Sequence, residues 1–115
     1  MVHNAMKKIQ ASFYALDSGK EPVREWLLKL GGIDRQAIGK DIQKVEFGWP
    51  IGMPYCRPLD KGLYEVRSNI SSGRIARVLF CIQKNQMILL YGFIKKTQAT
   101  PKHEIDIARK RMKGI

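Results

Sequence analysis

The residues best suited to chemistry in this sequence are basic, and they gather in its second half. Residues 1–56 contain eight Lys or Arg against six Asp or Glu, whereas residues 57–115 contain thirteen against four, which divides the net charge of +11 into +2 and +9. Two adjacent lysines, Lys95 and Lys96, directly follow the apolar run "ILLYGFI". A charge this large exceeds what solubility requires. It indicates an anionic partner, which could be nucleic acid, an acidic membrane surface or an acidic protein.

The other residues give little indication of a metal site or a cofactor site. Cys56 and Cys81 show neither CxxC nor Cys/His ligand spacing, so we expect them to be small packing residues. No pair of carboxylates and no cluster of metal ligands is visible in the sequence, which disfavours metal-assisted hydrolysis. We therefore predict neither a bound metal nor a cofactor.

The length and composition are those of one ordinary globular domain covering residues 1–115. No apolar run approaches the roughly 20 residues that a membrane-spanning helix needs. The start, "MVHNAMKKIQASF", lacks the uninterrupted apolar stretch of a signal peptide. We therefore expect a cytoplasmic protein with no membrane association.

The first half of the chain is expected to form one strand and two helices. Alternating apolar residues favour a strand at residues 7–16. Apolar residues at helical spacing favour one helix at residues 21–30 and another at residues 35–47, with Asp34 as the N-cap of the second. Residues 48–62 contain three prolines and are expected to be irregular.

The second half switches to a hydrophobic period of two. Three such segments, separated by turn residues, predict an antiparallel meander of three strands. These segments are "LYEVRSNI", "RIARVLFCI" and "MILLYGFI". The last segment, "TPKHEIDIARKRM", predicts a helix with Thr100 as its N-cap and with Ile105 and Ala108 facing the sheet. The order β-α-α-β-β-β-α indicates an α+β domain whose helices pack on one face of a small, mainly antiparallel sheet.

Alternation along the predicted meander places basic side chains among apolar ones. Arg67 shares a strand face with Leu63 and Glu65, and Arg77 lies among apolar residues of the next strand. A sheet covered by helices on one face can leave the other face open, and an open basic face suits RNA. The alternative is that these arginines are solvated or pair with acidic residues such as Glu65 and Asp60.

Two long segments of this half resemble a known family. They are "GLYEVRSNISSGRIARVLF" and "ILLYGFIKKTQATPKHEIDIARKRM". They look like the second half of the phage-derived, HigB-like toxins of type II toxin–antitoxin modules, within the RelE-type superfamily. The segment "EPVREWLLKL" is similar to the first helix of that family. The resemblance implies a RelE-like fold and a ribosome-dependent endoribonuclease that cuts messenger RNA during translation.

The resemblance also implies partners. A helix-turn-helix antitoxin (HigA-like), encoded beside the toxin, would neutralise it, and the toxin would reach operator DNA only through the complex with that antitoxin. The other expected partners are messenger RNA on the ribosome and ribosomal RNA.

The resemblance further implies which residues act. By position in the quoted segments, Arg67 and Arg77 match strand positions where relatives place basic active-site residues, and Lys95 and Lys96 match the basic segment before the final helix. Cutting RNA without a metal uses the neighbouring 2′-OH as nucleophile, so the enzyme must remove that proton, stabilise phosphate charge and protonate the leaving oxygen. Arginine suits the second task because its planar fork grips phosphate in a bidentate manner.

We therefore expect Arg67 and Arg77 to hold the scissile phosphate. One of Lys95 and Lys96 is expected to stabilise charge or transfer a proton. Alternation points neighbouring strand residues to opposite faces, so at most one of the two lysines should line the RNA groove. Glu65 is expected to be a structural partner of Arg67 rather than a base.

A further set of residues is expected to contact RNA. Tyr64 and Phe93 could stack on bases, although such aromatic residues more often fill the core. His103 could act as an acid or base, or it could be a solvated helix residue. Arg74 completes the set as another basic strand residue, and Lys102 contacts either ribosomal RNA or only water.

Two other functions fit the same residues. Net charge, an open sheet and aromatic side chains would also suffice for a non-catalytic RNA-binding or ribosome-associated module. A toxin-like protein could instead act only as half of a DNA-binding repressor complex. The codon preference and the identities of the general acid and base do not follow from the sequence.

Overall fold

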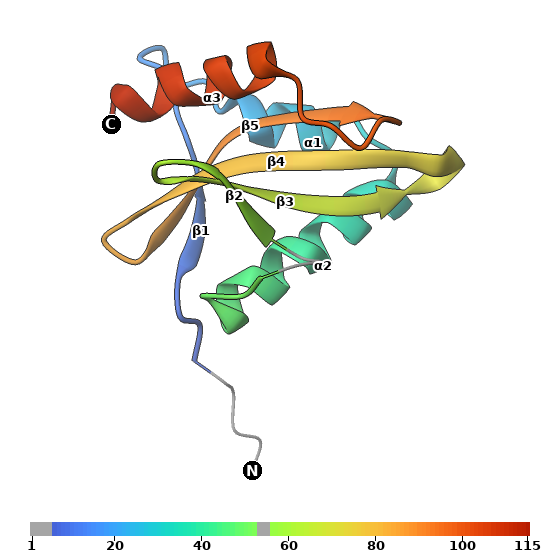
Figure 1. Ribbon diagram of the computed structural model, residues 1–115, viewed down its shortest axis with the longest axis horizontal. Coiled ribbons are helices and arrows are strands. Elements are labelled where there is room, and N and C mark those ends of the chain that lie inside the picture. Colours follow the sequence, from blue (N-terminus) through green and yellow to red (C-terminus); the bar gives the residue numbers. More distant parts are fainter. Residues whose placement is uncertain (1–5, 53–55) are drawn as a thin grey trace.

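The computed structural model describes residues 6–52 and 56–115, which form a five-stranded sheet and three helices (Figure 1). The strands are β1 (Gln10–Phe13), β2 (Cys56–Asp60), β3 (Leu63–Ile70), β4 (Arg74–Gln83) and β5 (Gln86–Lys95). The helices are α1 (Pro22–Leu28), α2 (Gly32–Gly48) and α3 (Lys102–Lys113), and a short 3-10 turn, Ser71–Gly73, joins β3 to β4. The sheet order is β1-β5-β4-β3-β2, with β1 parallel to β5 and the other neighbours antiparallel. The α+β class and the predicted meander are confirmed.

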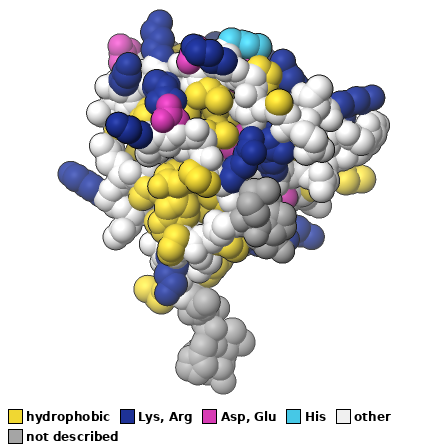
Figure 2. Space-filling view, viewed as in Figure 1, with side chains coloured by type: hydrophobic (Ala, Val, Ile, Leu, Met, Phe, Trp, Pro, Cys, Tyr) yellow, Lys and Arg dark blue, Asp and Glu magenta, His cyan; other side chains and the backbone are white. Residues whose placement is uncertain are grey.

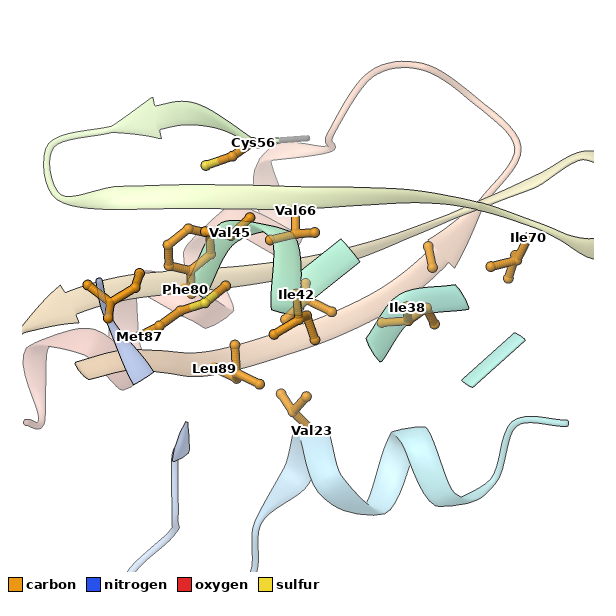
Figure 3. Close-up of a cluster of buried hydrophobic side chains, with 13 residues drawn as sticks. Val23, Ile38, Ile42, Val45, Cys56, Val66, Ile70, Phe80, Met87 and Leu89 are labelled. Carbon is orange, nitrogen blue, oxygen red and sulfur yellow. The ribbon is translucent and has the colours of Figure 1, made fainter. Parts of the chain in front are cut away.

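The helices α1 and α2 pack on one face of the sheet and form the larger hydrophobic cluster with it (Figure 3). Val23 of α1 and Ile38 and Ile42 of α2 meet Val66 and Phe80 of the strands, and all five are at most 7% exposed. Burial of one such side chain stabilises the fold by about 1.5–3 kcal/mol. The burial of Ile38 and Ile42 confirms the apolar side predicted for α2.

The helix α3 packs against the opposite face, so the helices do not all lie on one side of the sheet. Ala108 has no exposed surface and lies in a second cluster with Leu63, Leu79 and Leu90, against which Ile105 also packs. The strands supply both clusters because successive side chains point to opposite faces and apolar residues occupy both sets. The predicted orientation of Ile105 and Ala108 towards the sheet is confirmed.

The segment 48–62, which was expected to be irregular, contains the edge strand β2. Within it, Pro58 pairs with Tyr64 of β3. An edge strand tolerates proline because one side of the strand makes no ladder hydrogen bonds. The prediction was therefore wrong for β2, while residues 53–55 of this segment lie outside the described residues.

Neither of the two predicted helix caps is formed. The helix α2 begins before Asp34, whose carboxylate accepts hydrogen bonds from Ser71 in the turn between β3 and β4. The helix α3 begins after Pro101, and the hydroxyl of Thr100 donates to Glu65 of β3 instead. In both cases a polar group from a distant part of the chain replaces the local backbone partner that a cap would use.

The strand β5 lies between β1 and β4, so the apolar run before Lys95 is an interior strand of the sheet. The strand β1 covers only residues 10–13 of the range 7–16 predicted for it. Across the described residues, none of the helices is long and apolar enough to cross a bilayer.

The two cysteines are free and buried, as predicted for packing residues. Cys56 belongs to the cluster under α1 and α2, and Cys81 belongs to the cluster under α3. Burial raises the pKa of the Cys56 thiol to about 11 and also raises the pKa of Cys81. Both thiols therefore stay protonated at neutral pH.

Candidate functional site

A cluster of charged side chains occupies the part of the sheet beside α3. Arg57 of β2 pairs in register with Glu65 of β3, and Arg67 of β3 pairs with Arg77 of β4. These four residues, called the basic cluster below, project from neighbouring strands on the same face. On the side of the molecule drawn in Figure 2, Lys and Arg side chains clearly outnumber Asp and Glu. Within the cluster, three arginines surround one carboxylate.

Glu65 has no exposed surface, and its carboxylate accepts three hydrogen bonds. Its Oε1 accepts from Nε of Arg57 at 2.8 Å and from Nε of Arg67 at 2.6 Å, and its Oε2 accepts from Oγ1 of Thr100 at 2.5 Å. Hydrogen bonds to an ionised group are about twice as strong as those between neutral groups. The prediction that Glu65 is a structural partner of Arg67 is confirmed.

Arg77 is the largest fully buried side chain among the described residues. Its guanidinium donates to three main-chain carbonyl oxygens, those of Ile75 at 3.4 Å, Lys95 at 3.2 Å and Thr97. Its Nε has no hydrogen-bond partner among residues 6–52 and 56–115. Because Arg77 has no exposed surface, it can touch a phosphate only if the segment around Thr97, to which it is bonded, moves.

The electrostatic surroundings of Arg77 are unfavourable for a buried cation. The pKa of Arg77 is lowered, first by burial and then by the positive charges of Arg67 and Arg57, while Glu65 acts in the opposite direction. Its guanidinium carbon lies 5.5 Å from the centre of the Phe93 ring. The ring supplies a cation–π attraction, which is weaker than an ion pair with a buried carboxylate. Across the described residues, no carboxylate accepts a hydrogen bond from Arg77.

Residues 96–100, called the strap below, lie in the connection from β5 to α3 (Figure 1) and are bonded to the basic cluster. Nη2 of Arg67 donates to the carbonyl oxygen of Gln98, and Nη1 donates to the Oε1 of the same residue at 3.2 Å. Two further bonds hold the strap. Arg77 donates to the carbonyl of Thr97, and the hydroxyl of Thr100 donates to the carboxylate of Glu65. The strap thus lies against the guanidinium groups of Arg67 and Arg77.

A second polar group lies where α3 begins. The buried Glu104 accepts a hydrogen bond from the hydroxyl of Tyr91 at 2.6 Å, and its Oε2 lies 3.6 Å from Nζ of Lys95. Burial, followed by the hydrogen bond to Glu104, raises the pKa of Tyr91 to about 12. The phenol therefore keeps its proton at neutral pH and acts as a donor.

The structure brings together three of the four residues that were predicted to be catalytic. Arg67 and Arg77 both hold the strap, and Arg77 donates to the carbonyl of Lys95. The side chain of Lys95 is directed to α3 and is partly buried, whereas Lys96 follows the end of β5 and is exposed. Sequence reasoning missed Arg57, because its strand was expected to be irregular.

The two aromatic residues predicted to stack on RNA take part in packing. The ring of Tyr64 stacks on Phe80 at 5.6 Å and meets Trp49 edge-on at 5.0 Å, in the cluster under α1 and α2. Phe93 is 6% exposed and lies beside Arg77. The structure thus supports the core alternative for both rings.

The other residues predicted to contact RNA are dispersed. Arg74 donates to Asp34 of α2 at 2.8 Å and holds the β3–β4 turn to that helix. Lys102 pairs with Asp106 one turn along α3 at 3.0 Å. The side chain of His103 is 69% exposed and lies 3.7 Å from Glu104. Lys102 and His103 thus lie on the solvated start of α3.

The chemistry that the basic cluster offers with its own side chains is anion binding and charge stabilisation. Within residues 6–52 and 56–115, no group of three or more His, Cys, Asp or Glu side chains is placed to hold a metal ion. The cluster instead concentrates guanidinium groups on one sheet face, with a lysine at the neighbouring strand end.

Comparison with known proteins assigns the chain to a family. No match was found among curated proteins. A family model described as "Phage derived protein Gp49-like" (DUF891) matches residues 25–113. This range contains α2, the four strands from β2 to β5, and α3. Because the match covers most of the chain, the protein belongs to the Gp49-like family of phage-derived proteins, which is associated with toxin–antitoxin systems.

Proposed function

We propose that this protein is the toxin of a type II toxin–antitoxin module and that it cuts messenger RNA on the ribosome. Family membership supports a toxin, and the resemblance of the second half to HigB-like toxins supports the cutting of messenger RNA. The observation that carries the proposal is the basic cluster, in which three arginines lie beside a single carboxylate that bonds only two of them, Arg57 and Arg67. Such a surplus of guanidinium donors suits a phosphodiester.

In the proposed reaction, the 2′-OH beside the scissile bond attacks the phosphorus. A 2′,3′-cyclic phosphate forms, and the 5′-oxygen of the next nucleotide leaves with a proton. Arg57 and Arg67, whose side chains are 35% and 16% exposed, hold the phosphate oxygens and stabilise the charge that builds up on them. Arg77 reaches the same phosphate only when the strap moves.

Lys95 is the lysine proposed to stabilise charge or transfer a proton. Its ammonium lies near Glu104 at the edge of the basic cluster, and 36% of its side chain is exposed. Lys96 lies beyond the end of the strand and, together with Lys102, is proposed to contact ribosomal RNA. The proposed protein partner is a helix-turn-helix antitoxin encoded beside the toxin, and operator DNA is reached only through their complex.

A non-catalytic RNA- or ribosome-binding protein is the second candidate. The observation in its favour is that Glu65, the carboxylate of the cluster, has no exposed surface and is held by three hydrogen bonds, so it is not accessible to accept the proton of a 2′-OH. Such a protein would use the same arginines to bind RNA and would leave it intact.

Brief induction of the protein in growing cells, followed by mapping of RNA ends, separates the two candidates. The wild type is expected to arrest growth and to create new messenger RNA ends inside translated regions. The Arg67→Gln variant should cut at least about tenfold less, because removal of one donor to a developing oxyanion typically lowers the rate by about 100- to 1000-fold.

Arg24→Gln is the matched control, because it removes one cation from the exposed side of α1, on the other face of the sheet. This variant should cut like the wild type. Intact messages after induction of the wild type would reject cutting, and undiminished cutting by a folded Arg67→Gln protein would reject the role of that arginine.

A further inference from the structure

The strap supplies neutral oxygen atoms to arginines that lack enough negative charge. Arg77 donates to the carbonyl of Thr97, and Arg67 donates to the carbonyl and the side-chain amide oxygen of Gln98. Main-chain carbonyls carry only a partial negative charge, whereas phosphate oxygens carry a formal charge and accept stronger, bidentate bonds from guanidinium groups. The strap oxygens thus occupy donors that a phosphate would bind more strongly.

Arg77 is the arginine of the basic cluster whose charge is least compensated by its hydrogen-bond partners. It has no exposed surface, its Nε has no partner in the described part of the chain, and the three groups that accept its hydrogen bonds there are carbonyls. An ionised side chain buried without an ionic partner is costly unless its environment compensates. The only carboxylate of the cluster, Glu65, is already shared between Arg57 and Arg67. The closed arrangement therefore leaves one guanidinium without a bonded counter-charge.

The strap itself has few other ties. Residues 96–99 are exposed, and no strap residue belongs to either hydrophobic cluster of the described chain. It contains no helix or strand. Apart from its bonds to Arg67 and Arg77, its main anchor is the bond from Thr100 to Glu65. Displacing such a segment breaks hydrogen bonds but removes no side chain from either hydrophobic cluster.

We infer that the strap is a displaceable cover whose oxygen atoms occupy the donors of Arg67 and Arg77 until an RNA phosphodiester replaces them. This inference rests on the proposed function and concerns the regulation of the same site. In the closed form, Arg57, Arg67 and Lys95 are the side chains within reach of RNA. In the open form, Arg77 joins them, so the complete phosphate site exists only when the strap is displaced, and RNA favours that form.

A cover of this kind lowers the measured affinity for RNA, because only the open fraction of the protein binds fully. Weakening the cover should therefore raise the affinity. If the strap were instead part of the RNA-binding surface, weakening it should lower the affinity. The direction of the change decides between the two arrangements.

Two variants weaken the strap without touching the arginines. Thr100→Val keeps the side-chain shape and removes the bond to Glu65, and Gln98→Ala removes the amide oxygen that lies 3.2 Å from Arg67. Gln98 is exposed, so its variant should fold even if the first one does not. Ser18→Ala, in the exposed turn before α1, is the matched control that also removes one small polar contact.

The test measures binding of a fluorescent, 2′-O-methylated oligoribonucleotide, which cannot be cut by 2′-OH attack, to the purified full chain. Both strap variants should bind about threefold to tenfold more tightly than the wild type. The control should bind like the wild type. In nuclear magnetic resonance spectra, the Nε–H signal of Arg77 should shift when the oligonucleotide is added to the wild type.

Weaker or unchanged binding by both strap variants, or an unmoved Arg77 signal in a saturated complex, would overturn the inference while leaving the proposed function intact. A wild type that does not bind the oligonucleotide and does not cut messenger RNA would overturn both.

Discussion

Replacing Glu65 by Gln should destabilise the protein, because it removes the only carboxylate among three arginines. Glutamine has nearly the same shape, but it keeps a single acceptor oxygen and adds an amide NH₂ that faces donors. At least one of the three hydrogen bonds that Glu65 accepts is then lost. Arg57, Arg67 and Arg77 are left to repel one another without a counter-charge.

The size of this effect follows from the burial of the groups involved. Hydrogen bonds to charged groups contribute roughly 1.5–3 kcal/mol each, and unpairing a buried ion costs about 3–5 kcal/mol. Glu65 has no exposed side-chain surface, but the side chains of Arg57 and Arg67 are 35% and 16% exposed and can regain some water. We therefore expect the free energy of unfolding to fall by about 2–4 kcal/mol.

Urea unfolding at neutral pH, followed by circular dichroism, measures this loss. Glu25→Gln is the matched control, because its side chain is 41% exposed and lies 3.9 Å from Lys20, so its loss should stay within about 0.5 kcal/mol. Added sulfate should restore part of the stability of Glu65→Gln, because it supplies negative charge to the arginines, and should help the wild type less. A Glu65→Gln protein as stable as the control would refute the account of the cluster.

Three further predictions concern the scaffold. A Cβ at Gly92 would lie 2.5 Å from the Trp26 ring, so Gly92→Ala should cost about 1–3 kcal/mol or more in urea unfolding; unchanged stability would contradict that close approach. The pKa of Tyr91 is raised from 10.0 to about 12, so its contribution to stability is present below pH 10 and is lost as the pH rises towards 12. An ultraviolet titration should show one phenol ionising last, and a Tyr91→Phe titration that keeps this step would speak against the assignment. Iodoacetamide should modify the thiols of Cys56 and Cys81 in urea but not in the native protein, because both are buried with a raised pKa; mass spectrometry that finds label on the native protein would disprove this.

The strands of the meander could be predicted because each is a run of eight to ten residues, rich in apolar and β-branched side chains, that ends at turn residues. The edge strand β2 could not, because Pro58 reads as a loop residue, and only the sheet order shows that it lies at an edge. The sequence also did not predict that α3 packs on the second face of the sheet. Apolar residues at both alternating sets of strand positions indicate that both faces of the sheet are covered, but they do not show which helix covers which face.

Part of the arrangement of the candidate site could be expected from the sequence. The resemblance led us to expect that Arg67 and Arg77 act on one phosphate, and the register places the two residues as neighbours on β3 and β4. Nothing in the spacing shows that the strap folds back over Arg77, because that depends on hydrogen bonds between residues about 20 to 35 positions apart. For the same reason, the prediction that Thr100 caps a helix was wrong. Its hydroxyl instead donates a hydrogen bond to Glu65.

The chemistry of the cut ends tests the proposed function most directly. Purified protein would be mixed with ribosomes that carry a defined message, and with the same message containing one 2′-deoxynucleotide at the cut position. Attack by the 2′-OH predicts fragments with 2′,3′-cyclic phosphate and 5′-hydroxyl ends and no cut at the 2′-deoxy position. An uncut message, 5′-phosphate ends, or equal cutting of both messages would contradict it.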